Sequence, residues 1–132
     1  MKRKTNKILL LLIIIVSSAV SVNSQEDNGP IISFEENKFS FDTIARNSNG
    51  EHNFFFVNAG SEPLLITSAF SSCGCVVPEF PKQPILPGEK SSIKVKYNTN
   101  IVGDFTKVIV VKSNAPKNPK SILRISGVVI DE

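Results

Sequence analysis

Cys73 and Cys75, separated only by Gly74, are the residues of this sequence whose types and spacing could do chemistry. In an extended strand, Cα atoms two residues apart are ~6.6 Å from each other, whereas a disulfide prefers ~5.5–6 Å. A disulfide between the two cysteines therefore needs a bent backbone, and glycine bends most easily. A disulfide that closes so short a loop would stabilise the fold by only ~1.5 kcal/mol. Stabilisation of the fold is therefore a weak explanation for this spacing.

Three interpretations of the pair stay open on the sequence alone. A reducible disulfide would suit redox chemistry in an exported protein, although the sequence has no Cys-x-x-Cys motif and no helix N-terminus to lower a thiol pKa. Two thiolates could instead bind Cu(I), which prefers sulfur ligands. Zn²⁺ would need four ligands, and His52, the only histidine, supplies at most one more. The third interpretation is a local disulfide, or two small residues in a tight turn, without a chemical role.

The remaining polar residues form no recognisable catalytic set. His52 has no Ser, Asp or Glu at a spacing typical of a catalytic triad, so we interpret it as a packed or solvated residue at the start of a strand. Three carboxylates lie at predicted strand ends or turns: Asp42, Glu51 and Asp104. The sequence contains no Gly-rich phosphate loop, no nucleophile elbow and no paired-carboxylate motif. We therefore expect a protein that is not an enzyme, with no cofactor apart from the Cu(I) alternative.

The first 24 residues have the order of a secretory signal peptide. Four basic residues precede an uninterrupted apolar run over residues 8–16, and a polar stretch of small residues ends at Ser24. A membrane anchor would need ~20 apolar residues, about twice the length of this run, so we favour cleavage after Ser24. The protein is then expected to be exported, periplasmic or secreted, and attached to a membrane only if the signal segment stays uncleaved.

This division changes the meaning of the net charge. The whole chain of 132 residues has a net charge of +3 and a pI near 9.0. Four of the 15 Lys and Arg residues, and none of the 12 Asp and Glu residues, lie within residues 1–24, so 11 basic and 12 acidic residues remain. The exported part is therefore near neutral, with no basic stripe of the kind that binds nucleic acid.

The sequence after the signal segment predicts an all-β fold. Residues 25–30 are polar and rich in turn formers, so we expect a flexible lead-in over residues 25–32, with the folded domain spanning residues 33–132. Apolar residues then recur with a period of two rather than 3.6, for example at Phe54/Phe56 and at Ile93/Val95/Tyr97. Asn58 and Gly60 are expected to form the turn after one such strand.

About seven short strands with frequent turn signals predict an immunoglobulin-like antiparallel β-sandwich. Ile32/Phe34 and Phe39/Phe41 suggest a first strand pair or one broken strand. The prolines between residues 78 and 87 predict a long connection that cannot be a central strand, since proline lacks the N–H needed in a sheet.

Several phrases of the sequence together resemble a known family. They include His52-x-Phe54-x-Phe56-x-Asn58-x-Gly60, then Ser72-Cys73-Gly74-Cys75, then Pro84-Ile85-x-Pro87-Gly88, and Leu123-x-Ile125-x-Gly127-x-Val129. This pattern resembles the exported bacterial domain-of-unknown-function family numbered fifteen-seventy-three, over roughly residues 33–130. The resemblance implies a sandwich similar to the hydin, abnormal-spindle and major-sperm-protein domains, which act as binding or scaffold modules.

Two hypotheses about function follow. The first is an exported, non-enzymatic immunoglobulin-like module that binds an envelope or extracellular protein, with exposed strand edges as one route for binding. The alternative is a redox or Cu(I)-binding protein that uses Cys73 and Cys75.

Overall fold

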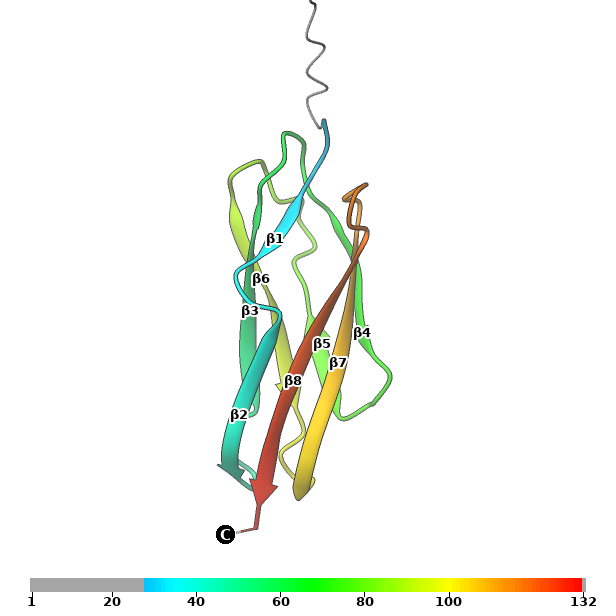
Figure 1. Ribbon diagram of the computed structural model, residues 1–132. Helices are drawn as coiled ribbons and strands as arrows, with labels where there is room; N and C mark the ends of the chain where they lie inside the picture. Colours follow the sequence, from blue (N-terminus) through cyan, green and yellow to red (C-terminus); the bar gives the residue numbers. More distant parts are fainter. Residues whose placement is uncertain (1–27, 132) are drawn as a thin grey trace, which may run out of the picture.

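The computed structural model of the protein describes residues 28–131 (Figure 1). The predicted signal peptide, residues 1–24, and the first part of the predicted lead-in lie outside the described residues. Within residues 28–131 no helix is long and apolar enough to cross a membrane.

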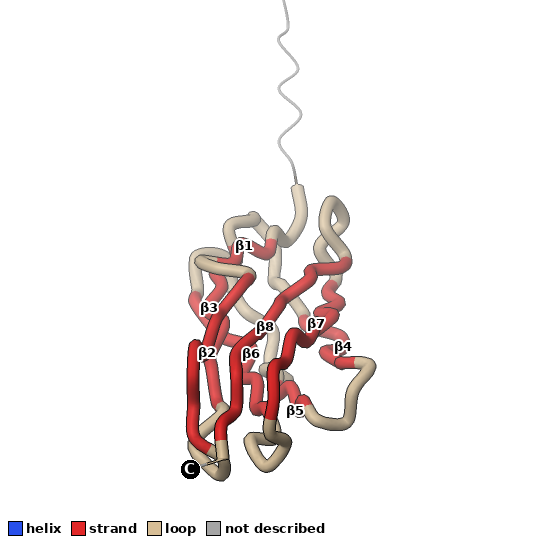
Figure 2. The backbone as a smooth tube through the Cα atoms, turned by 60° about the horizontal axis from the view of Figure 1, so that its bottom comes forward, coloured by secondary structure: helices blue, strands red, loops and turns tan. Residues whose placement is uncertain are grey.

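Two four-stranded sheets face each other and form a sandwich (Figures 1 and 2). Sheet A has the strand order β1-β3-β6-β5, and sheet B has the order β2-β8-β7-β4. The strands are β1 (Ile32–Phe34), β2 (Lys38–Ala45), β3 (Glu51–Asn58), β4 (Ile66–Ser71), β5 (Val76–Glu79), β6 (Lys90–Tyr97), β7 (Gly103–Ser113) and β8 (Lys120–Ile130).

The core lies between the two sheets and is built by alternating apolar residues. In sheet A, Phe54 and Phe56 of β3 and Ile93 of β6 are fully buried. In sheet B, Ile109 of β7 and Leu123 of β8 are equally buried. Because alternate residues of a strand point to opposite faces, each strand gives one row of side chains to the core. This architecture confirms the predicted all-β, immunoglobulin-like sandwich.

The chain changes sheets between β1 and β2. Of the two interpretations of Ile32/Phe34 and Phe39/Phe41, the strand pair is therefore wrong, because β1 pairs with β3 and β2 pairs with β8. The alternative, one broken strand, agrees with the short break at residues 35–37 between β1 and β2. The pairing of β2 with β8 is parallel, in contrast to the antiparallel sandwich we expected. A period of two reports burial on one face, and it carries no information on strand direction.

An additional strand, β5, brings the number of strands within residues 28–131 to eight. It contains Pro78, in the segment predicted to be a connection, and it is an edge strand paired only with β6. Proline is compatible with this position, because one side of an edge strand makes no hydrogen bonds to a neighbour.

The ordered fold begins before the expected boundary at residue 33. Gly29 and Pro30 are buried, and the carbonyl oxygens of Gly29 and Ile31 accept hydrogen bonds from the N–H groups of Ser61 and Ala59, at 3.0 and 2.9 Å. Residues 29–32 are therefore part of the sandwich, and not of a lead-in. The sequence predicted a lead-in here because the residues that precede this segment are polar and typical of a linker.

Tyr97, the only tyrosine of the chain, gives the core a spectroscopic probe. Its ring is buried and stacks on Phe105, with ring centroids 3.8 Å apart. Burial raises the pKa of Tyr97 above its ordinary value near 10.0, because the charged phenolate loses solvation.

We expect the stability of the fold to fall as pH rises above 10. A raised folded-state pKa means that the stability is fully present below the unfolded-state pKa and is lost between that value and the folded-state pKa. Absorbance at 295 nm should show a tyrosine titration shifted to higher pH than in urea-unfolded protein. Tyr97→Phe should remove this part of the pH dependence; equal titration curves for folded and unfolded protein would contradict the prediction.

Candidate functional site

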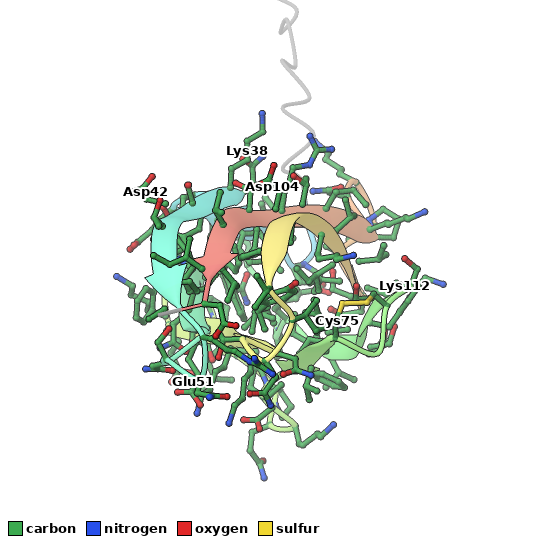
Figure 3. All side chains as sticks on the ribbon, turned by 90° about the horizontal axis from the view of Figure 1, so that it is seen from below. Lys38, Asp42, Glu51, Cys75, Asp104 and Lys112 are labelled. Atoms are coloured by element: carbon green, nitrogen blue, oxygen red, sulfur yellow. A yellow bond between two sulfur atoms is a disulfide. The ribbon has the colours of Figure 1, made fainter. Side chains whose placement is uncertain are left out.

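The Cys73-Gly74-Cys75 segment forms a tight turn between β4 and β5. The two cysteines are joined in a disulfide, with Cα atoms 5.2 Å apart (Figure 3). This separation is shorter than in an extended strand, so the chain bends at Gly74 as the sequence required. Cys75 is buried in the core, and Cys73 packs against the core while partly exposed.

The disulfide turn also supplies hydrogen-bond partners to the start of β5. The N–H of Cys75 donates to Cys73 Sγ at 3.2 Å, and the N–H of Val76 donates to the Cys73 carbonyl oxygen at 3.3 Å. On the other side of β5, the Cys75 carbonyl oxygen accepts a hydrogen bond from Asn98 at 2.8 Å.

These contacts close the outer edge of β5 to a further strand. Hydrogen-bonding residues alternate along an antiparallel pair. The backbone N–H and C=O groups of Cys75 and Val77 therefore point toward β6, and the backbone groups of Val76 and Pro78 point outward. The Val76 N–H is already bonded to Cys73, and Pro78 has no N–H. The outer edge of β5 thus offers no free donor, which disfavours edge-to-edge pairing.

Removing the disulfide is expected to cost little. A Cys73→Ala/Cys75→Ala double variant should lose about 1.5 kcal/mol of unfolding free energy, because the closed loop is very short. Urea denaturation of the variant beside the oxidised and reduced wild type measures this. Unfolding of the reduced protein without denaturant would contradict a minor structural role.

His52 does not join the cysteines in the structure. It lies on β3, where Nε2 is 2.6 Å from Glu36 Oε1 and the ring stacks on Phe39 at 3.6 Å between centroids. Strand β6 separates β3 from β5 in sheet A. Among residues 28–131, no three His, Cys, Asp or Glu side chains are grouped as metal ligands, and neither cysteine has a free thiol.

Of the three carboxylates considered from the sequence, Glu51 lies apart from the other two. Glu51 lies on sheet A between Lys94 and Lys96, at 3.5 and 3.8 Å from their Nζ atoms. Asp42 and Asp104 lie on the opposite side of the molecule (Figure 3). The structure therefore does not bring Glu51 together with either of the other two carboxylates.

A row of exposed and half-buried apolar residues, which no pattern in the sequence indicated, crosses the outer face of sheet B. Phe70 of β4 is paired with Val110 of β7, which is paired in turn with Ile122 of β8. Directly paired residues point to the same face of a sheet. Phe70 and Ile122 are 47% and 44% exposed. Alternation marked these residues as facing away from the core, but only the strand register shows that they lie side by side.

Basic side chains lie on both sides of this row. Lys112 and Lys120 are paired in the next row toward one end, and the Lys112 ammonium lies 5.7 Å from the centre of the Phe70 ring. Toward the other end, Arg124 is paired with Lys38 of β2. None of these four residues belongs to an ion pair among the described residues. The outer face of sheet B thus combines exposed apolar surface with uncompensated positive charge.

The sandwich and its open outer face define an immunoglobulin-like domain, and no group of metal ligands is assembled among residues 28–131. The chain belongs to the family described as "Protein of unknown function (DUF1573)", whose model matches residues 32–129. The resemblance noted in the sequence is therefore confirmed. No curated protein matches the chain.

Solved structures support the fold. A protein of unknown function from Porphyromonas gingivalis W83 has a TM-score of 0.69 and 11% identity, covering 78% of this chain and 48% of its own. The chain thus spans about half of that structure. The PapD-like domain 7 of human CEP192 has a TM-score of 0.59 and 11% identity, covering 76% and 86%. The periplasmic chaperone SfaE has a TM-score of 0.53 and 8% identity, covering 77% and 58%.

Proposed function

We propose that the protein is an exported, non-enzymatic binding module that attaches to another protein of the bacterial cell envelope. The observation that carries this proposal is the apolar row of Phe70, Val110 and Ile122 on the outer face of sheet B. Exposed apolar surface rimmed by polar groups is typical of protein-binding sites.

Other features support the same proposal. The residues before the described domain have the order of an export signal, and the similar structures include a periplasmic chaperone. The basic rim around the row would attract a partner with acidic side chains and favour its correct orientation.

The proposal is tested with the exported part of the chain, residues 25–132, immobilised and exposed to solubilised envelope proteins of the encoding bacterium. We expect a specific partner whose direct binding, measured with purified components, weakens at least about tenfold in Phe70→Ser. A control is Val77→Ser, which changes an exposed apolar residue on sheet A. No specific partner, or equal losses in both variants, would overturn the proposal.

A further inference from the structure

A hollow lies beside the apolar row, between the edges of the two sheets. It has a volume of about 590 Å³ and is lined by residues 32–37 on one side and by Asn118 and Lys120–Ile122 on the other. Ile122, the last residue of the apolar row, also lines the hollow. Its volume falls within the range of ligand sites, ~300–1,000 Å³.

The hollow exists because β2 accompanies only part of β8. The pairing of these strands begins at Lys38 and Arg124, and β2 runs beside the lower part of β8 (Figure 1). Residues Lys120–Leu123 of β8 therefore have β7 on one side and no strand on the other.

The backbone groups of Lys120 and Ile122 point toward this unpaired side. The Ser113 N–H donates to the Pro119 carbonyl oxygen, so in the alternating antiparallel pattern the backbone groups of Ser121 and Leu123 point toward β7. The opposite direction is taken by the backbone groups of Lys120, Ile122 and Arg124. The Arg124 N–H confirms this direction, because it donates to the Asn37 carbonyl oxygen at 2.9 Å. No described backbone group takes the corresponding place beside Ile122.

Strand β1 contributes a second open edge to the same hollow. Ile31 and Glu35, the residues on either side of β1, are hydrogen-bonded to Ala59 and Phe55. By the same alternation, the backbone N–H and C=O groups of Ser33 point toward β3, and those of Ile32 and Phe34 point away from it. All three residues of β1 line the hollow.

The other sheet edges are protected. Strand β5 has no free outward donor, as described above. Strand β2 has a bulge between Ser40 and Thr43, where Asp42 has a φ of 54°, and β4 has a register shift between Ile66 and Ser68. Bulges disrupt the regular ladder that an added strand would need.

Charge identifies the kind of segment that fits. The two carboxylates that line the hollow already have partners: Glu35 forms an ion pair with Lys90, and Glu36 is hydrogen-bonded to His52. Lys120, at the hollow, and Arg124 and Lys38, at its end, have no carboxylate partner among the described residues. The charged side chains at the hollow that have no partner among the described residues are therefore basic.

We propose that this hollow binds an extended acidic segment of the partner protein, which pairs as an added strand with Lys120–Leu123 of β8. Main-chain hydrogen bonds would supply affinity, as in other complexes formed by strand addition, and acidic side chains would contact Lys120 and Arg124. This inference rests on the proposed binding function and places the partner's contact at the unpaired side of Lys120–Leu123.

Amide hydrogen exchange of the wild-type protein tests the open edge directly. In the free protein, the amides of Lys120 and Ile122 should exchange at least about tenfold faster than those of Ser121 and Leu123, which are bonded to β7. Equal protection of all four amides would overturn the proposal without any variant being made.

Binding is tested with a displayed library of random peptides about eight residues long, which is within the usual range of strand lengths. We expect enriched peptides to be acidic and to slow exchange of the Lys120 and Ile122 amides. Ile122→Pro removes one edge N–H and should weaken their binding at least about tenfold, whereas Ile122→Thr keeps the N–H and should weaken it less. Thermal melting of both variants controls for folding.

Each other outcome is decisive. Enrichment of basic peptides, binding that leaves the two amides unprotected, or no enriched peptide would overturn the inference. If the envelope partner binds folded Ile122→Pro and Ile122→Thr equally tightly, while Phe70→Ser weakens its binding, this inference fails and the proposed function stands.

Discussion

Replacing Gly60 with alanine is expected to lower the free energy of unfolding by about 3 kcal/mol, since forcing an atom into a filled space strains the backbone. An added Cβ would lie 2.2 Å from the Gly29 carbonyl oxygen and 2.6 Å from the Ile31 nitrogen. Both atoms are held in place: the Gly29 oxygen accepts the Ser61 N–H, and the Ile31 N–H donates to the Asn58 side chain. Neither can move away without breaking a hydrogen bond.

Gly74→Ala provides the matched control. An added Cβ at Gly74 meets no atom within 4 Å, so this substitution should change stability by less than about 0.5 kcal/mol. Urea denaturation of both variants, monitored by circular dichroism, measures the difference in their free energies of unfolding. If Gly60→Ala unfolds at the same urea concentration as Gly74→Ala, residues 29–31 do not lie as close to Gly60 as the structure shows.

The sequence predicted the sandwich because its main signal is physical and local. Alternating burial in β3, β6, β7 and β8 follows directly from the apolar pattern, and each of these strands contains residues that the pattern placed in the core. Strand partners and directions depend on contacts between distant residues. This is why the sheet change between β1 and β2 and the parallel pairing of β2 with β8 could not be predicted.

The candidate site was predictable only where the chemistry is local. Cys73 and Cys75 are two residues apart, so their proximity was evident, and the structure joins them. The row of Phe70, Val110 and Ile122 is assembled from three strands and depends on their register. No spacing in the sequence relates these residues, and the same is true of the hollow between β1 and β8.

Replacing Asn58 with alanine is expected to cost about 3–5 kcal/mol, because buried polar groups left without partners cost about 1–3 kcal/mol each. Asn58 is fully buried at the end of β3. Its side-chain N–H₂ donates to the carbonyl oxygens of Glu62 and Ile85, at 2.7 and 2.9 Å. Its side-chain oxygen accepts from the N–H groups of Gly60 and Ile31, at 3.0 and 3.3 Å.

The expected loss is large because one side chain ties three parts of the chain together. The four bonds of Asn58 join the segment before β1, the turn around Gly60 and the connection that contains Ile85. Asn53→Ala, on an exposed face of the same strand, should change stability by less than about 0.5 kcal/mol. Equal urea midpoints for the two alanine variants would show that Asn58 does not hold this junction.

Asn58→Asp separates the role of the donors from that of side-chain shape. The substitution keeps the size of the side chain and the acceptor oxygen for Gly60, but it places a second oxygen against the carbonyl groups of Glu62 and Ile85. At neutral pH a buried carboxylate beside two acceptors should destabilise the fold at least as much as alanine does. Protonation restores one donor, so the deficit relative to wild type should shrink as pH falls toward 4, the ordinary range of a carboxyl group. A deficit that stays constant between neutral pH and pH 4 would mean that the donated bonds are not what Asn58 contributes.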